Sequence, residues 1–257
     1  MRVRSLAAAS CAALALAITA PAVAAPTATP GPTGTITVSA AASLTDVFPV
    51  IAAAFMKRFP GTSVKFNFGG SSALVQQVLA GAPVDVLATA SEATMWKATN
   101  AGAVGRPLLF AKNSMAVVMP KDNPAGISRL SDLTRPGVLV GVCAVQVPCG
   151  AAAGDLLAKN SLTLRPVTLE LDVRTLLSKV VSGDLDAGIV YVTDVRAALD
   201  QVSSVAIPSH LNVLTTYPIA AVVDAPNPTA AAAFVAYVRY TPSAQGILRA
   251  YGFAKPW

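Results

Sequence analysis

Strand-like and helix-like segments alternate along this chain from residue 34 onward, and no other feature limits its fold as strongly. Short β-branched or apolar runs alternate with segments in which apolar residues recur every three or four positions. The expected strands are residues 35–40, 63–68, 84–89, 115–119, 138–142, 167–170, 187–192 and 219–223. The expected helices are residues 44–55, 72–80, 92–99, 151–159, 173–181, 229–240 and 242–251. Strands joined through helices form mostly parallel sheets with right-handed crossovers, so the sequence predicts an α/β fold.

The alternation occurs in two successive units, which predicts two lobes joined by more than one crossing of the chain. We expect lobe 1 to contain residues 35–112 and 217–257, and lobe 2 to contain residues 113–216. Each lobe is expected to be a mostly parallel sheet flanked by helices. Because open α/β sheets bind ligands beyond the carboxyl ends of their strands, we expect one ligand site in the cleft between the lobes.

The first 24 residues have the pattern of an export signal. Arg2 and Arg4 precede an apolar stretch, and small residues at 22–24 form a cleavage site, so we expect cleavage after residue 24. Residues 25–34, rich in Pro, Thr and Gly, are expected to be a disordered leader. The protein is therefore predicted to act in the periplasm or at the outer face of the cytoplasmic membrane. Lipid attachment at Cys11 is an alternative, although most of the apolar stretch follows that residue.

The composition of the sequence bears on nucleic-acid binding and on disulfide formation. Without Arg2 and Arg4 the chain has 17 basic and 13 acidic residues, and charged residues make up only 12% of the sequence without forming a basic run. This pattern argues against nucleic-acid binding. Cys143 and Cys149 remain in the exported chain, and thiols this close in an oxidising compartment are expected to form a disulfide. Two buried free thiols are the alternative.

Ser43 and Ser71 each lie where a predicted strand ends and a helix begins. A helix N-terminus offers unpaired backbone N–H groups and partial positive charge, and a serine there adds a hydroxyl donor. Two such ends aimed at one point would hold a small anion without a charged side chain. The alternative is that each serine only caps its own helix, and Asp46 completes a weak capping box with Ser43. Pro49 is expected to kink the first helix or force a local adjustment.

Three further positions could contribute neutral donors. Pro148 favours a helical start, which would leave the N–H of Cys149 free at a helix N-terminus. Asp172 is the expected N-cap of the next helix, with the N–H of Val173 exposed beside it. Tyr191 ends a predicted strand, and its phenol either points out of the sheet as a donor or packs at an interface with its hydroxyl satisfied.

Known catalytic motifs are missing from the sequence. His210 is the only histidine, and no nucleophile elbow, zinc-protease motif or phosphate-binding loop occurs. The carboxylates form no tight cluster that would hold a metal ion. We therefore predict that the protein is not an enzyme and uses no cofactor. A secreted hydrolase with Ser43 or Ser71 as nucleophile, and a structural or adhesive export protein, are alternatives from other classes.

Six stretches of the sequence together resemble the periplasmic molybdate-binding proteins, which are the solute receptors of molybdate ABC importers. The stretches are AASLT (41–45), GGSSAL (69–74), GAPVDV (81–86), VPCG (147–150), DVR (172–174) and GIVY (188–191). They occur in the family's order across most of the exported chain. The resemblance implies a two-lobed periplasmic-binding fold of the second type that holds one buried oxyanion, molybdate or tungstate, and presents it to a membrane permease.

The resemblance also implies the ligand set. By position, Ser43 and Ser71 would donate through hydroxyl and backbone N–H groups, Cys149 and Val173 through backbone N–H groups, and Tyr191 through its phenol. Molybdenum would be bound only as its oxyanion. Cys149 departs from the family, which often has alanine there, but the backbone donor is the same.

Further predictions concern the oligomeric state and the choice of anion. We expect a monomer, and a receptor for sulfate or another tetrahedral oxyanion is the alternative function. A pocket built only of donors would disfavour a protonated anion such as hydrogen phosphate, whose proton needs an acceptor. Asp172 is the one nearby carboxylate that could accept it.

Overall fold

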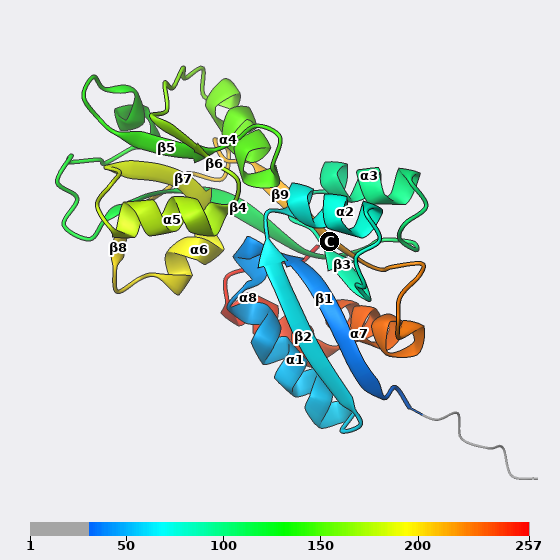
Figure 1. Ribbon diagram of the computed structural model, residues 1–257. Helices are drawn as coiled ribbons and strands as arrows, with labels where there is room; N and C mark the ends of the chain where they lie inside the picture. Colours follow the sequence, from blue (N-terminus) through cyan, green and yellow to red (C-terminus); the bar gives the residue numbers. More distant parts are fainter. Residues whose placement is uncertain (1–30, 257) are drawn as a thin grey trace, which may run out of the picture. The chain divides into compact units, whose positions relative to one another are not determined.

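A mixed sheet of nine strands forms the centre of the computed structural model, which describes residues 31–256 (Figure 1). The strands lie in the order β2-β1-β3-β9-β4-β7-β5-β6, and β8 pairs with β4 outside this path. Their bounds are β1 (Gly34–Ala41), β2 (Thr62–Gly69), β3 (Val86–Ala88), β4 (Leu108–Pro120), β5 (Val140–Cys143), β6 (Thr168–Glu170), β7 (Ala187–Tyr191), β8 (Val202–Ala206) and β9 (Leu214–Ala221).

Helices cover both faces of the β2-β1-β3-β9 half of the sheet. The helices are α1 (Val47–Arg58), α2 (Ser71–Leu79), α3 (Glu92–Asn100), α4 (Pro148–Lys159), α5 (Val173–Val181), α6 (Val192–Ala197), α7 (Pro228–Tyr240), α8 (Pro242–Ala250) and the 3₁₀ helices η1 (Ala42–Leu44) and η2 (Leu130–Thr134). Helices α1, α7 and α8 pack on one face of this half, α2 and α3 on the other, and α4, α5 and α6 flank the β4-β7-β5 half (Figure 1). Strand β3 shows the result, because Val86 and Ala88 enter the larger core while Leu87 enters the α2–α3 cluster.

Two long strands connect the two halves of the sheet. The first part of β4 pairs with β9, and its second part pairs with β7 and β8. Lys112 lies opposite Thr216 and Asn113 opposite Thr215, so the predicted lobe boundaries fall inside two hydrogen-bonded, antiparallel strands.

The expectation of mostly parallel sheets is only half right. Strands β2, β1 and β3 are parallel to one another, as are β6, β5 and β7, but every pairing of β4 and β9 is antiparallel. The sequence prediction found only residues 115–119 of β4, because polar Lys112 and Asn113 interrupt the apolar run before them. It also missed β8, with its two central serines, and the short helix α6.

Pro49 is accommodated by a local adjustment at the start of the helix. Helix α1 begins at Val47, three residues later than predicted, so Pro49 lies in its first turn, where no intrahelical N–H bond is lost. The residues before it form η1 instead, and Asp46 makes no side-chain cap.

The predicted export signal, cleavage after Ala24, Cys11 and the leader up to residue 30 lie outside the described residues. The last residue of the predicted leader, Gly34, already belongs to β1, and the Thr33 carbonyl accepts a hydrogen bond from Asn227 Nδ2 (2.6 Å). Within residues 31–256 no helix has the length and apolar character needed to cross a membrane.

Candidate functional site

The five predicted site residues surround one cavity, although they come from five different elements. They are Ser43 in η1, Ser71 at the start of α2, Cys149 in the first turn of α4, Val173 at the start of α5 and Tyr191 at the end of β7. Each is at most 4% exposed. The cavity, about 20 Å³, is also lined by Ala41, Ala42, Gly69, Gly70, Ala90, Val147, Pro148, Leu171 and Asp172. A cavity needs about 10–15 Å³ to hold one water molecule, so this one has room for little more than that.

Three helices, α2, α4 and α5, begin at residues that line this cavity, and the first backbone N–H groups of a helix have no partner within it. Helix α4 begins at Pro148, the proline that favours a helical start, three residues before the predicted range of 151–159, so the next residue, Cys149, lies in the first turn. Helix α5 has the predicted bounds and the predicted cap, because Asp172 Oδ1 accepts from the N–H groups of Arg174 (2.8 Å) and Thr175 (2.9 Å). The cap does not use the N–H of Val173, which remains a donor beside the cavity.

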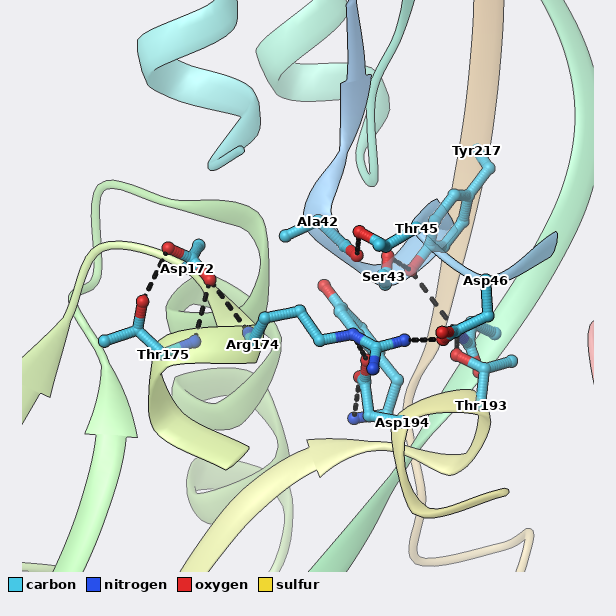
Figure 2. Close-up of polar contacts among 12 residues, drawn as sticks. Ala42, Ser43, Thr45, Asp46, Asp172, Arg174, Thr175, Thr193, Asp194 and Tyr217 are labelled. Atoms are coloured by element: carbon cyan, nitrogen blue, oxygen red, sulfur yellow. Dashed lines mark hydrogen bonds and ion pairs between the residues drawn. The ribbon is translucent and has the colours of Figure 1, made fainter. Parts of the chain in front are cut away.

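Neither serine caps its helix through its hydroxyl. The N-cap of α2 is Gly70, and Ser71 Oγ accepts a hydrogen bond from the Ala90 N–H (3.1 Å). Ser43 Oγ lies 2.9 Å from the phenol oxygen of Tyr217 (Figure 2). The interpretation of the two serines as simple caps, and the predicted Ser43–Asp46 capping box, are therefore wrong.

The Tyr191 phenol is a buried donor that has no hydrogen-bond partner among residues 31–256. Its side chain is 1% exposed, and its oxygen makes no hydrogen bond within the described part of the chain. Burial raises the pKa of Tyr191 well above its ordinary value, so the phenol keeps its proton. A buried hydroxyl that lacks a partner is costly unless a ligand supplies one.

The predicted disulfide between Cys143 and Cys149 is confirmed, with 5.6 Å between the two Cα atoms. It joins the end of β5 to the first turn of α4. Gly150 completes this tight connection, since a Cβ there would overlap the carbonyl oxygens of Ala144 and Cys143. The loop that carries the Cys149 N–H is thus held by a covalent bond and by close packing.

The two halves of the sheet also approach each other closely beside the cavity. A Cβ on Gly70, before α2, would overlap the Leu171 carbonyl oxygen, which precedes α5. Ser72 Oγ donates to the Gln146 carbonyl (2.7 Å), which precedes α4. These contacts bring the segment before and at the start of α2 against the segments that precede α4 and α5.

Charged groups are gathered next to the cavity but do not line it with positive charge. Arg174 forms ion pairs with Asp46 and with buried Asp194 (3.3 Å), as Figure 2 shows. Burial raises the pKa of Asp194 to about 7, and the Arg174 guanidinium opposes this rise. Asp172 is the one charged residue among the lining residues described, and its oxygens accept from the α5 N-terminus and the Thr175 hydroxyl.

Sequence reasoning missed the residues that support the site from behind. Tyr217 and Asn113 lie in β9 and β4, and Thr193 and Asp194 in α6, all buried. Tyr217 is 174 positions from Ser43, and no local pattern predicts such a contact. Within residues 31–256 no cluster of three or more histidine, cysteine or acidic side chains could hold a metal ion, and His210 is exposed in a turn.

The fold and the buried cavity define a protein that encloses a small solute. A family model described as bacterial extracellular solute-binding protein matches residues 36–254. The molybdate-binding protein ModA of Mycobacterium tuberculosis is 41% identical over 218 residues, which cover 84% of this chain and 83% of ModA. The chain therefore belongs to the family of bacterial extracellular solute-binding proteins, which are not enzymes.

Solved structures share the fold at lower identity. The periplasmic molybdate-binding protein of Azotobacter vinelandii superposes with a TM-score of 0.77 at 21% identity, covering 86% of this chain and 100% of that one. The sulfate-binding protein SubI of M. tuberculosis superposes with a TM-score of 0.74 at 23% identity, covering 86% and 87%. These matches confirm the predicted two-lobed periplasmic-binding class of fold. They do not distinguish molybdate from sulfate as the ligand, because the TM-scores of the molybdate-binding and sulfate-binding proteins are close.

Proposed function

We propose that this protein captures molybdate, or tungstate through the same contacts, and delivers it to the permease of an ABC importer. The observation that carries the proposal is the cavity itself, where Ser43, Ser71 and Tyr191 present neutral hydroxyl groups beside the first turns of α4 and α5. The identity to ModA over most of the chain supports molybdate as the anion.

The donors of the cavity suit a tetrahedral dianion in chemistry. Hydrogen bonds to a charged partner contribute about 1.5–3 kcal/mol each. About five to seven of them, less the costs of closure and desolvation, leave about 8–11 kcal/mol, which corresponds to dissociation constants from micromolar to tens of nanomolar. Fixed neutral donors select an anion by size and protonation, whereas an exposed lysine or arginine would bind many anions.

Lobe movement is part of this proposal. We assign residues 35–112 and 217–257 to lobe 1 and residues 113–216 to lobe 2, with a hinge where β4 and β9 cross side by side. The cavity is lined from both lobes, so ligand entry requires them to separate. The permease would recognise the closed form by the lobe surfaces around the cavity.

The site of action and the assembly state follow from the same proposal. The exported chain would act outside the cytoplasmic membrane as a monomer, either free or held by a lipid on Cys11. Mass spectrometry of the protein from its native membrane fraction distinguishes cleavage after Ala24 from lipid attachment.

Calorimetric titration tests the function. The chain from Ala25 onward is unfolded, dialysed and refolded to remove bound ligand, and then titrated with molybdate, tungstate, sulfate and phosphate. We expect one-to-one binding of the first two at micromolar or lower dissociation constants, with weaker sulfate binding. Sulfate binding as tight as that of molybdate would replace the named anion, and the absence of heat with every anion would contradict the proposal.

Replacing Ser71 by alanine tests the site within the same experiment. The Ser71→Ala change removes one donor to the anion, so the binding free energy should weaken by about 1–3 kcal/mol without loss of folding. Ser63→Ala, at an exposed position of β2, is the matched control and should bind like the unchanged protein. An unchanged affinity for Ser71→Ala would remove Ser71 from the site.

A further inference from the structure

A chain of buried hydrogen bonds leads from the backbone of β4 to Ser43. The Ser114 N–H donates to Asn113 Oδ1 (3.0 Å), and Asn113 Nδ2 donates to Tyr217 Oη (3.3 Å) and to Thr193 Oγ1 (2.8 Å). Tyr217 Oη lies 2.9 Å from Ser43 Oγ (Figure 2). This series of hydrogen bonds therefore connects β4 and β9 with α6 and with η1, which carries Ser43.

The direction of this chain is fixed at its backbone end. The N–H of Ser114 can only donate, so the amide oxygen of Asn113 must face it. The amide nitrogen of Asn113 then faces Tyr217 and supplies one of its protons to the phenol oxygen. A flipped amide would place the Asn113 nitrogen against another donor, which is unfavourable.

The Tyr217 phenol determines whether Ser43 donates or accepts in their shared hydrogen bond. Tyr217 is fully buried, and burial raises its pKa above the ordinary value, so it remains protonated. Either oxygen could donate in the 2.9 Å contact between Tyr217 Oη and Ser43 Oγ, and we assign the donor role to Tyr217 because its oxygen already accepts from Asn113 Nδ2. Since the Ser43 oxygen accepts from Tyr217, the Ser43 proton is free to point into the cavity.

We propose that Asn113 and Tyr217 are positioning residues that hold Ser43 as a hydrogen-bond donor towards the cavity and thereby select a fully deprotonated tetrahedral anion. This inference rests on the proposed function, because it assumes that the cavity binds such an anion. A ligand that carries a proton needs an acceptor in the cavity, and the fixed hydrogen-bond chain denies it one at Ser43. The oxygens of Asp172, the one carboxylate among the lining residues described, already accept from the N-terminus of α5 and the Thr175 hydroxyl.

Ser71 is also held as a donor towards the cavity, but by a backbone N–H group rather than by a side chain. Its oxygen accepts from the backbone N–H of Ala90, so its proton is also free for the cavity. A side-chain substitution cannot remove that backbone donor. The Ser43 side is therefore the part of the selection that mutation can change.

The test is the ratio of phosphate to molybdate affinity at pH 8, measured by competition calorimetry on refolded protein. At this pH molybdate carries no proton, whereas phosphate is the monohydrogen dianion. Tyr217→Phe keeps the aromatic ring but releases Ser43 to accept as well as donate. We expect about tenfold weaker molybdate binding and a ratio that rises about tenfold, as for one charge-assisted hydrogen bond that is no longer fixed.

Two controls separate this effect from general damage. Tyr237→Phe removes a buried phenol whose partner is Ser243, away from the cavity, and should leave the ratio unchanged. Thr193→Val removes the other hydrogen-bond partner of Asn113 but leaves the Asn113 amide as donor to Tyr217, so the ratio should again stay unchanged. A purely structural role for Tyr217 would weaken both anions equally and leave the ratio constant.

Asn113→Leu provides a second route if Tyr217→Phe does not fold. It removes the amide donor, so Tyr217 can accept from Ser43 and the ratio should again rise. An unchanged ratio in the folded variants, with molybdate still bound by the unchanged protein, would overturn the inference alone. If the unchanged protein binds no molybdate, the proposed function fails first.

Discussion

Ser43, Ser71 and Tyr191 differ in how the structure prepares them as donors. The Ser71 oxygen accepts from the Ala90 N–H, and Ser43 Oγ lies within hydrogen-bond distance of the Tyr217 phenol, whereas the Tyr191 phenol has no partner in the described chain. Preparing donors in this way costs reorganisation energy at folding rather than at binding. The residue types could be identified from sequence, but their partners could not, because those lie in distant strands.

At the residue scale, Gly70 provides a prediction about closure. Gly70→Ala should weaken molybdate binding about tenfold to hundredfold, because the added methyl meets the Leu171 carbonyl and keeps the two halves apart. The backbone at Gly70 is extended, so alanine fits it and the free energy of unfolding should change little. Gly154→Ala, at an exposed position of α4 outside the cavity, is the control, since its methyl would meet nothing within 4 Å. Equal affinities for the two variants in calorimetry would contradict this account.

At the scale of elements, the site is assembled from the ends of strands and the starts of helices. The bounds of α5 were predicted correctly, since Asp172 is a strong cap and the apolar residues that follow have clear helical spacing. The predicted start of α1 at residue 44 was wrong. A serine at a predicted cap position, such as Ser43, gives the same sequence signal whether a 3₁₀ turn or an α-helix follows. Local pattern determines that a turn occurs, but packing decides its type.

The disulfide at the start of α4 predicts a moderate gain in stability. Replacing Cys143 and Cys149 together by alanine should lower the free energy of unfolding by about 2 kcal/mol, the loop-closure value for a short loop. Urea denaturation of the two proteins measures this difference. A thiol assay on the unfolded, unreduced protein should find neither thiol free. Two free thiols would contradict the disulfide.

At the scale of the whole molecule, β4 and β9 make one sheet out of two sets of parallel strands. Arg174 adds a second link, because its ion pairs reach Asp46 before α1 and Asp194 in α6. The sequence predicted several crossings between lobes, but which strands cross depends on pairings of residues about a hundred positions apart.

The Asp194 carboxyl predicts how stability depends on pH. Burial raises the pKa of Asp194 to about 7 from 3.8, with Arg174 lowering it and Asp46 and Asp172 adding to the rise. Between about pH 4 and pH 7 the folded protein therefore binds a proton that the unfolded chain has released. The stability that this proton contributes is fully present below about pH 4 and is lost as the pH rises through 7.

Comparison with Asp194→Asn isolates this effect. The free energy of unfolding of the unchanged protein, relative to the variant, should fall by a few kcal/mol between pH 4.5 and 7.5, in proportion to the pKa difference. Urea denaturation at several pH values measures it. A relative stability that stays level or increases over this range would show that the Arg174 ion pair keeps Asp194 ionised.

Local features of the sequence, such as periodicity, helix ends and cysteine spacing, were enough to predict the α/β class, the disulfide and the cap of α5. The five residues that meet at the cavity were predicted from these features together with the stretches that resemble a known family. The folded protein was needed to find the mixed sheet, the contact between Ser43 and Tyr217, and the burial of Asp194. Those depend on which distant strands pair and which polar groups lose water together, and such long-range choices leave no periodic signal in the chain.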